Sequence, residues 1–216
     1  MSRFAILLGG AVTRTPELEA EIAGARVIAA DSGIRHAGLL GVVPELWLSD
    51  FDSVSNTLLQ ANPEVPREVF PTDKDKTDGE LAVDAALQRG AASLALVGAF
   101  GGSRQDHVLL HLTQAIRLAE QGIPTVLTSG DQVGQALSCG RTHAFDYPDG
   151  TLFSILPFSD LAGLTVAGAK WPLNAVEVPF GSSLTMSNVV EGQLTITLKQ
   201  GRALLLVTVN AANQED

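Results

Sequence analysis

The sequence predicts an α/β domain with a mainly parallel sheet, followed by an all-β unit. Up to about residue 130, short apolar runs alternate with longer segments of helical periodicity, which is typical of βαβ units with both sheet faces covered. Beyond about residue 140 the helical period ends, and short strand-like runs follow one another between Gly, Pro and Asp. We therefore place the boundary near residues 131–150, with domains at residues 1–135 and 140–212.

The individual elements follow from local patterns along the chain. Apolar runs predict the strands of the first part, at residues 4–10, 26–33, 45–52, 93–102 and 124–130. Helical spacing predicts helices at residues 15–24, 77–90 and 106–122, and a shorter segment, residues 34–41, follows the second strand. The strands expected in the second part are residues 151–158, 164–169, 174–180, 183–189, 193–199 and 203–209. The tail, residues 210–216, is expected to be frayed.

Composition limits the class of protein. The chain has 216 residues, 45% of them hydrophobic and 18% charged, which indicates a globular protein. A net charge of −10 argues against sequence-independent nucleic-acid binding. We expect no signal peptide and no transmembrane helix, and hence a cytoplasmic location. Cys139 is the single cysteine, so it cannot form an internal disulfide, and we expect it to be a small packed residue rather than a nucleophile.

Acidic residues gather where strands of the first part are predicted to end. Asp50 and Asp52 close the third strand, and an extended backbone would send both to one side with Phe51 on the other. Ligands of open parallel sheets bind beyond the carboxyl ends of the strands. Further aspartates are expected at the same edge: Asp31, Asp73, Asp75, Asp78 and Asp106. A lone Asp is more often a helix cap, and residues 77–80 form a fair capping box, but capping explains a whole acidic edge poorly.

Clustered carboxylates without cysteine suit a hard cation, most simply Mg²⁺ held together with a substrate phosphate. Glycines in residues 98–107 precede a helix start, where free N–H groups favour an anion. No Walker-type phosphate loop occurs, and "LLGGAV" lacks the full dinucleotide fingerprint, so a nicotinamide cofactor is not expected. His107 and His111 lie four apart without the Glu of a zinc protease, and we expect His111 to be packed. Cationic side chains that could meet phosphate oxygens are Lys74, Lys76, Arg104 and His107.

Five short motifs in this order resemble thiamine pyrophosphokinases: "SDFDS", "DKDKTDGELA", "GGSRQDH", "GAKWPL" and "SN". The resemblance covers nearly the whole chain. It implies a Rossmann-like α/β domain followed by a β-sandwich, a homodimer with shared active sites, and transfer of pyrophosphate from ATP to the thiamine hydroxyl with Mg²⁺ present and AMP released. Members of the family usually have Gly where this chain has Ser49, whose Cβ disfavours positive φ.

The resemblance also implies roles for individual residues. Metal ligands would be Asp50, Asp52 and Asp78, and the catalytic set would be Asp50, Asp52, Asp75, Asp78 and Asp106, one of which could act as general base. ATP and its phosphates would contact Asp31, Lys74, Lys76, Thr77, Gly101, Gly102, Arg104 and His107. Thiamine would contact Ser187, Asn188 and Trp171. Trp171 could offer its ring to the cationic ligand, although a Trp in a strand-rich domain is more often a core residue.

Two other functions fit part of the pattern. One is a pyrophosphokinase with another acceptor, such as a hydroxymethylpterin, because the half that binds metal and ATP would look alike. The segment from "KWPL" to "SN" favours thiamine over that acceptor. The other is a non-catalytic regulator that binds a nucleotide or thiamine. A pure binder gains little from crowding carboxylates around a triphosphate, which argues against it.

Overall fold

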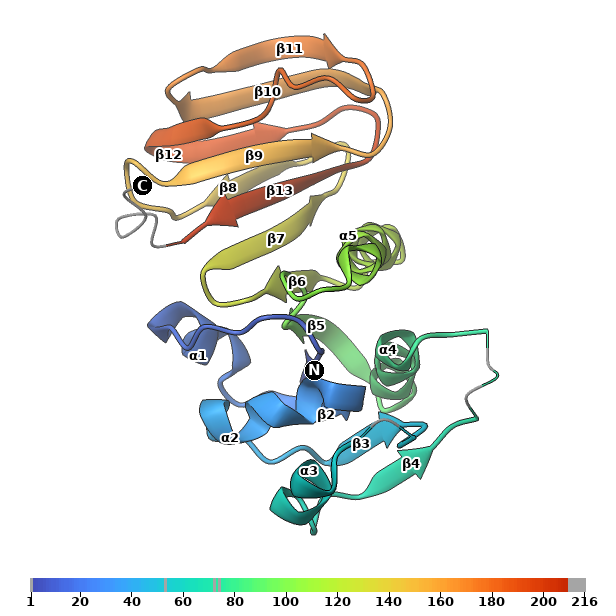
Figure 1. The fold of residues 1–216 in the computed structure, drawn as a ribbon. Coiled ribbons are helices and arrows are strands. Elements are labelled where there is room, and N and C mark those ends of the chain that lie inside the picture. The colour runs from blue at the N-terminus through green and yellow to red at the C-terminus, as the bar shows by residue number, and fades with distance from the viewer. Residues whose placement is uncertain (1, 53, 72, 74, 210–216) are drawn as a thin grey trace. The chain divides into compact units, whose positions relative to one another are not determined.

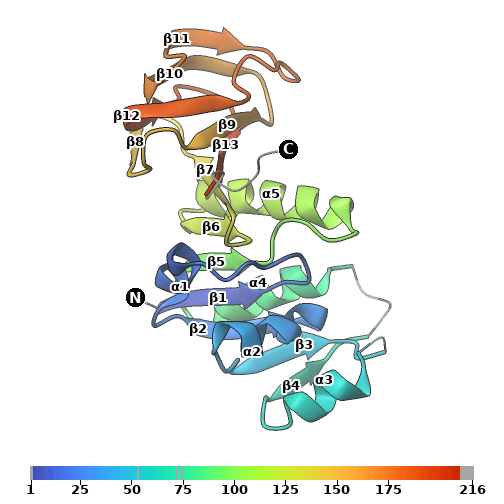
Figure 2. The same ribbon diagram turned by 60° about the vertical axis from the view of Figure 1, so that its left-hand side comes forward.

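The computed structural model describes residues 2–52, 54–71, 73 and 75–209 (Figures 1 and 2). The chain forms two compact units. The first comprises the described residues up to His111 together with Ile123–Gly130. The second comprises Leu112–Gly122 and the described residues from Asp131 onward. The predictions of a phosphate contact for Lys74 and of a frayed tail at residues 210–216 concern positions outside the described residues.

The first unit is built on a parallel sheet with the strand order β4-β3-β2-β1-β5-β6. Its strands are β1 (Ser2–Leu7), β2 (Arg26–Ala30), β3 (Leu46–Ser49), β4 (Arg67–Val69), β5 (Ala91–Val97) and β6 (Thr125–Thr128). The chain adds β2, β3 and β4 on one side of β1, and then adds β5 and β6 on the other. The order therefore reverses between β1 and β5, which is where open α/β sheets bind their ligands.

Both faces of this sheet carry helices (Figure 2). The helical segments of this unit are α1 (Pro16–Ile22), the 3₁₀ helix η1 (Asp31–Arg35), α2 (His36–Leu40), α3 (Asn56–Ala61) and α4 (Asp78–Gln88). Helix α5 (Gln105–Glu120) begins in the first unit, and its residues from Leu112 onward belong to the second. Buried residues of α1, η1 and α2 pack with alternate strand residues such as Leu7, Ala29 and Trp47. Helix α4 contacts β1, β2, β3 and β5. Because β1, β2, β3 and β5 are mainly buried, these strands are continuous apolar runs and are easily predicted.

Two differences from the predicted first unit have physical causes. Strand β3 ends at Ser49, not at residue 52, because Phe51 adopts a φ of 60° that no strand accommodates. Strand β4 was not predicted, since its three residues are all exposed and carry no apolar pattern. Among the described residues, no helix is long and apolar enough to cross a bilayer.

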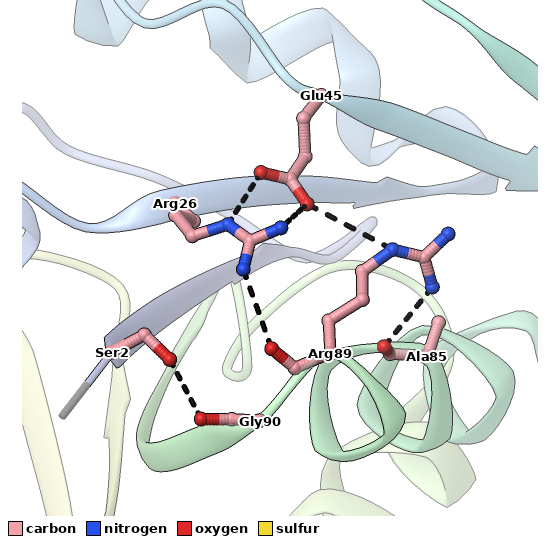
Figure 3. A network of polar contacts seen from close by, with 6 residues as sticks. All are labelled: Ser2, Arg26, Glu45, Ala85, Arg89 and Gly90. Carbon is pink, nitrogen blue, oxygen red and sulfur yellow. Dashed lines mark hydrogen bonds and ion pairs between the residues drawn. The ribbon is translucent and has the colours of Figure 1, made fainter.

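At the amino ends of β1 and β2, a polar network joins the strands to the turn after α4 (Figure 3). Arg26 donates two hydrogen bonds to the carboxylate of Glu45, at 2.8 and 2.6 Å. Arg26 also donates to the carbonyl of Arg89 at 3.3 Å, and Ser2 donates to the carbonyl of Gly90 at 2.6 Å. Exposed ion pairs add little stability. We infer that this network instead holds the turn at Arg89 and Gly90 in place against the starts of β1 and β2.

The second unit contains the antiparallel strands of the chain. They are β7 (Gln132–Leu137), β8 (Thr142–Phe145), β9 (Leu152–Pro157), β10 (Leu161–Ala169), β11 (Leu173–Val178), β12 (Asn188–Thr197) and β13 (Ala203–Thr208). Strand β13 pairs with β7 and β9, while β12 pairs with β8, β9 and β10. One apolar cluster, which includes Leu164, Val190 and Leu205, forms the core of this unit.

Two predictions for this unit are wrong. The separate strands expected at 183–189 and 193–199 are one strand, β12, because Gly192 lies inside it at a register shift with β10 and does not end it. The segment before Asn188 is instead a turn with Ser187 at a φ of 56°. Cys139 is exposed rather than packed, and its thiol donates to the carbonyl of Gly201 at 3.0 Å.

Two nearby glycines provide a stability test. A Cβ on Gly33 would lie 2.1 Å from the Leu7 carbonyl oxygen, whereas a Cβ on Gly38 would meet nothing within 4 Å. We expect Gly33→Ala to destabilise the first unit by about 3 kcal/mol or more. Gly38→Ala, the matched control, should stabilise it by about 0.5–1 kcal/mol because Gly disfavours the helix interior.

Urea unfolding followed by Trp47 fluorescence measures both changes, in a Trp171→Phe background that leaves a single tryptophan. Equal midpoints for the two variants would show that η1 shifts without cost.

Candidate functional site

A pocket of about 300 Å³ lies in the first unit at the carboxyl ends of β1, β2 and β5. This is the point where the strand order reverses. Backbone from the loops after β1 and β5 forms one wall, at Gly9, Gly10, Gly98, Gly101 and Gly102. The polar side chains that line the pocket are Asp31, Ser32, Arg35, Thr77, Asp78, Ser103, Arg104, His107 and His111.

The glycine wall depends on close contact between two backbones. The Gly10 amide donates to the Gly98 carbonyl at 3.0 Å, and the Ala11 amide donates to the Phe100 carbonyl at 2.8 Å. A Cβ on Gly10 would lie 2.3 Å from both of those carbonyl oxygens. Side chains are therefore excluded from the contact between the two loops, and the backbone itself lines the pocket at Gly9, Gly10 and Gly98.

The start of α4 forms the facing side of the pocket. Thr77 Oγ1 accepts from the Glu80 amide at 3.2 Å, and Glu80 Oε2 accepts from the Thr77 amide at 3.3 Å. These two bonds confirm the predicted capping box. Asp78 and Gly79 lie inside that box and line the pocket as well.

Asp31 enters the pocket from the end of β2. Its backbone has a φ of 47°, its carbonyl accepts from Trp47 Nε1 at 2.9 Å, and its Oδ1 accepts from Ser49 Oγ at 3.1 Å. Ser49 does not have positive φ, so the glycine that the resemblance implies there is not required by the backbone conformation. The residue with positive φ in this segment is Phe51, at 60°.

Asp50 and Asp52 form a turn beyond β3 and do not line this pocket. Asp50 Oδ1 accepts from the Asp52 amide at 3.2 Å. Because β3 ends at Ser49 and Phe51 has positive φ, the expected strand alternation of these side chains is wrong. Asp75 is exposed and also lies outside the pocket lining.

Among the cations, Arg104 lines the pocket and is held by Asp106. Arg104 donates from Nε and Nη2 to the two oxygens of Asp106, at 3.0 and 2.7 Å. These hydrogen bonds lower the pKa of Asp106 from 3.8 to about 2. Asp106 is therefore ionised at neutral pH and orients the guanidinium. Lys76 forms an ion pair with Asp84 at 2.5 Å and lies outside the lining.

His107 and His111 both line the pocket, with ring centroids 6.3 Å apart. His111 is buried, as predicted, and its Nδ1 lies 3.1 Å from the carbonyl oxygen of Ala99. Burial lowers the pKa of His111, so the ring is neutral at pH 7. The proton then sits on Nδ1, where it donates to Ala99, and Nε2 is an acceptor.

Several lining residues were missed from sequence: Gly9, Gly10, Ser32, Arg35 and Ser103. Arg35 Nη2 donates to the carbonyls of Gly9 and Gly10, and His36 Nε2 lies 3.0 Å from the Gly10 carbonyl. The loop after β1 could have been found, since the strand-end rule that identified Asp31 applies equally to "AILLGG". Nothing in the sequence marks Arg35.

In the second unit, the residues predicted to bind thiamine lie together. Asn188 is buried, and its side chain accepts from the Trp171 amide at 3.2 Å and donates to the Trp171 carbonyl at 2.8 Å. Trp171 is 53% exposed, so the alternative that it is a core residue is wrong. Lys170 Nζ lies 4.9 Å from the centre of its ring. The Ser187 amide donates to Ser154 Oγ at 2.9 Å.

The described residues contain no group of three acidic, histidine or cysteine side chains arranged to hold a metal ion. Mg²⁺ needs fewer protein ligands, because it commonly binds one or two carboxylates together with water and substrate phosphates. The oxygen-only donors at this edge, Asp31, Asp50, Asp52 and Asp78, fit such an ion by their chemistry.

The lowered pKa of His111 predicts a pH-dependent stability. The unfolded chain takes up a proton near pH 6.5 that folded His111 resists, so stability falls as the pH drops below that value. His111→Asn keeps an amide donor for Ala99 and removes the titration. We expect the free energy of unfolding, measured in urea at pH 7.5 and 5.5, to fall less in the variant than in the wild type. An equal fall in both would contradict this.

Comparison with known proteins gives consistent results. The family model "Thiamin pyrophosphokinase, catalytic domain" matches residues 22–127, and "Thiamin pyrophosphokinase, vitamin B1 binding domain" matches residues 142–203. A thiamine pyrophosphokinase from Bacillus subtilis (strain 168) is 28% identical over 172 residues, which cover 77% of this chain and 79% of the relative.

Solved structures agree with these matches. A crystal structure of thiamine pyrophosphokinase from Bacillus subtilis has a TM-score of 0.83 and 25% identity, over 97% of this chain and 100% of the other. One from Geobacillus thermodenitrificans has a TM-score of 0.79 and 26% identity, over 98% and 99%. The enzyme from Candida albicans, at 12% identity and a TM-score of 0.80 over 96% and 90%, shares the fold. With both of its family models matched in succession, the chain belongs to the thiamin pyrophosphokinase family.

Proposed function

We propose that this enzyme transfers pyrophosphate from ATP to the hydroxyl of thiamine, with Mg²⁺ as the cofactor, and releases AMP and thiamine diphosphate. The single observation that carries the proposal is the pocket at the reversal of strand order, where a glycine wall faces the start of α4 beside an acidic edge. The start of α4 and the guanidinium of Arg104, both of which line the pocket, suit phosphate oxygens.

In this proposal, ATP lies in a Rossmann-like domain spanning residues 1–135. Gly101 and Gly102, which line the pocket, leave room for phosphates, and Thr77 ends the facing loop. Arg104 contacts phosphate in the orientation that Asp106 gives it, and His107 lies beside it. Asp31 contacts the nucleotide or its metal ion. Lys74 and Lys76 are assigned to phosphate by the resemblance, and Lys76 would have to exchange its partner Asp84.

Asp50, Asp52 and Asp78 would hold Mg²⁺. When bound, the ion neutralises charge on the phosphate oxygens. The protein's own task is positioning: it holds the thiamine hydroxyl in line with the β-phosphorus and the leaving AMP oxygen. The new bond joins the thiamine oxygen to the β-phosphorus, the bond from that phosphorus to AMP breaks, and the hydroxyl proton passes to a carboxylate. Asp75 and Asp106 complete the acidic set from which that base comes.

The acceptor would bind residues 140–212, which we propose form a β-sandwich. Thiamine is cationic and aromatic, and the half-exposed ring of Trp171 offers it a π face. Ser187 and Asn188 would recognise its aminopyrimidine edge. The hydrogen bond that Asn188 accepts from the Trp171 amide and the one that it donates to the Trp171 carbonyl would set the position of the ring. We further propose a cytoplasmic homodimer, in which each active site combines the ATP-binding half of one subunit with the thiamine-binding half of its partner.

Family membership does not favour the two other functions considered from sequence. A hydroxymethylpterin acceptor would not need the vitamin B1 binding domain matched at residues 142–203. A non-catalytic regulator would not need the catalytic domain matched at residues 22–127.

The direct test is to incubate the pure protein with ATP, Mg²⁺ and thiamine. Equal amounts of AMP and thiamine diphosphate support the proposal. ADP with thiamine monophosphate would contradict it, and no turnover would favour the regulator.

Asp52→Asn tests the metal assignment. The change keeps the size of the side chain and removes one charge, so we expect turnover to fall by roughly 10²-fold or more, the scale of one lost preorganised electrostatic contact. Asp146→Asn, the same change at an exposed position of the second unit, is the control and should leave turnover near the wild-type value. Asp52→Asn activity within a few-fold of wild type would remove Asp52 from the site.

Subunit mixing tests the shared active sites. Asp52→Asn disables one half, and the double change Ser187→Ala with Asn188→Ala disables the other. After co-refolding in equal amounts, about half of the dimers are mixed and each rebuilds one intact site, so activity should return to about a quarter of wild type. Native mass spectrometry confirms that subunits have exchanged. If each active site instead forms within a single chain, the mixture will stay as inactive as its parents.

A further inference from the structure

The Ser49 hydroxyl joins two strand ends at the acidic edge. Ser49 is the last residue of β3 and is 0% exposed. Its Oγ donates to Asp31 Oδ1 at 3.1 Å and accepts from the Phe51 amide at 3.1 Å. One buried group therefore connects the end of β2 with the turn that carries Asp50 and Asp52.

Both partners of this hydroxyl have unusual backbones. Asp31 has a φ of 47° and Phe51 a φ of 60°, and positive φ is a genuine outlier for a bulky residue such as Phe. Each such residue carries backbone strain and persists only where its surroundings hold it. The two Ser49 hydrogen bonds are among the contacts that do so.

Trp47, two residues before Ser49 on β3, also contacts both Asp31 and Phe51. Its Nε1 donates to the Asp31 carbonyl at 2.9 Å, and its ring lies edge-on to the Phe51 ring with centroids 5.0 Å apart. The Asp31 backbone is thus held by Trp47 while its carboxylate is held by Ser49. The bond to Oδ1 fixes the rotation of the carboxylate and so the direction in which Oδ2 faces.

A buried serine often does no more than satisfy its own hydroxyl through a backbone carbonyl. Ser49 instead donates to the Asp31 carboxylate, which lines the pocket. The same hydroxyl oxygen accepts from the Phe51 amide and so restrains the neighbouring turn. Bonds to charged groups are also stronger than bonds between neutral ones. These partners indicate a role in the site beyond the packing of β3.

We propose that Ser49 is a positioning residue for pyrophosphate transfer: its hydroxyl sets the Asp31 carboxylate in the pocket. The inference rests on the proposed function, because it assumes that Asp31 contacts the nucleotide or its metal ion. Ser49 acts through Asp31 and does not touch the substrates.

A double-mutant cycle of Ser49→Ala and Asp31→Gly tests this. Glycine removes the carboxylate and accepts the positive φ at position 31. We expect Ser49→Ala to lower kcat/KM for ATP by about ten-fold, the scale of one hydrogen bond to a charged group. In the Asp31→Gly background, the same change should cost less than about two-fold, because its target is gone. The KM for thiamine should stay at the wild-type value.

A binding measurement separates positioning from activity. Calorimetry with Mg²⁺ and α,β-methylene-ATP, which cannot be cleaved at the reacting bond, should show affinity about ten-fold weaker for Ser49→Ala. Ser49→Thr keeps the hydroxyl and should recover most of that loss. Ser55→Ala, which removes the exposed cap of α3, is the matched control and should bind as the wild type does. Melting temperatures confirm that every variant is folded at the assay temperature.

The outcomes distinguish the two levels of the proposal. If the wild type binds and turns over but the Ser49→Ala loss is equal in both backgrounds, the role of Ser49 is structural and this inference is overturned. The inference is also overturned if Ser49→Thr is no better than Ser49→Ala although both fold. If the wild type neither binds the analogue nor forms AMP, the proposed function fails, and this inference fails with it.

Discussion

The pocket depends on the backbone contact between the loops after β1 and β5. The Gly10 and Ala11 amides donate to carbonyls of the opposite loop, and no side chain fits between them. The reversal of strand order brings these two loops together, since β1 and β5 are neighbours although β2, β3 and β4 come between them in sequence. Asp78 of α4, Arg104 and Asp31 line the pocket that this contact helps to form. A sheet that added its strands in sequence order would have no such wall.

Contacts within the protein hold the aspartates at the acidic edge in place. Some carboxylates are committed to the protein: Asp106 orients Arg104, and Asp31 accepts from Ser49. Asp50 and Asp52 lie in a turn whose shape is held by hydrogen bonds and by the Trp47–Phe51 ring pair. Strained backbone at Asp31 and Phe51 fits a site built for a ligand, because stability alone would select residues without positive φ.

Most of the first unit could be predicted from sequence, because strands covered on both faces are continuous apolar runs and α4 carries a complete capping box. Short exposed β4 has no such pattern, and Gly192 gave the wrong boundary because a glycine can lie inside a bulged strand as well as end one. Motif glycines and aspartates were found from strand ends. The contacts of Ser49 with Asp31 and of Arg35 with Gly9 and Gly10 were not, since these partners lie 18 or more residues away and meet only in the folded sheet.

The backbone wall of the pocket also bears on drug resistance. An enzyme commonly escapes an inhibitor by exchanging a side chain that the inhibitor touches. At Gly10 and Gly98 any such exchange would drive a Cβ to 2.3 or 2.6 Å from a carbonyl oxygen of the opposite loop. An inhibitor that packs closely against this backbone would therefore face few viable escape mutations, because the changes that dislodge it would also disrupt the pocket.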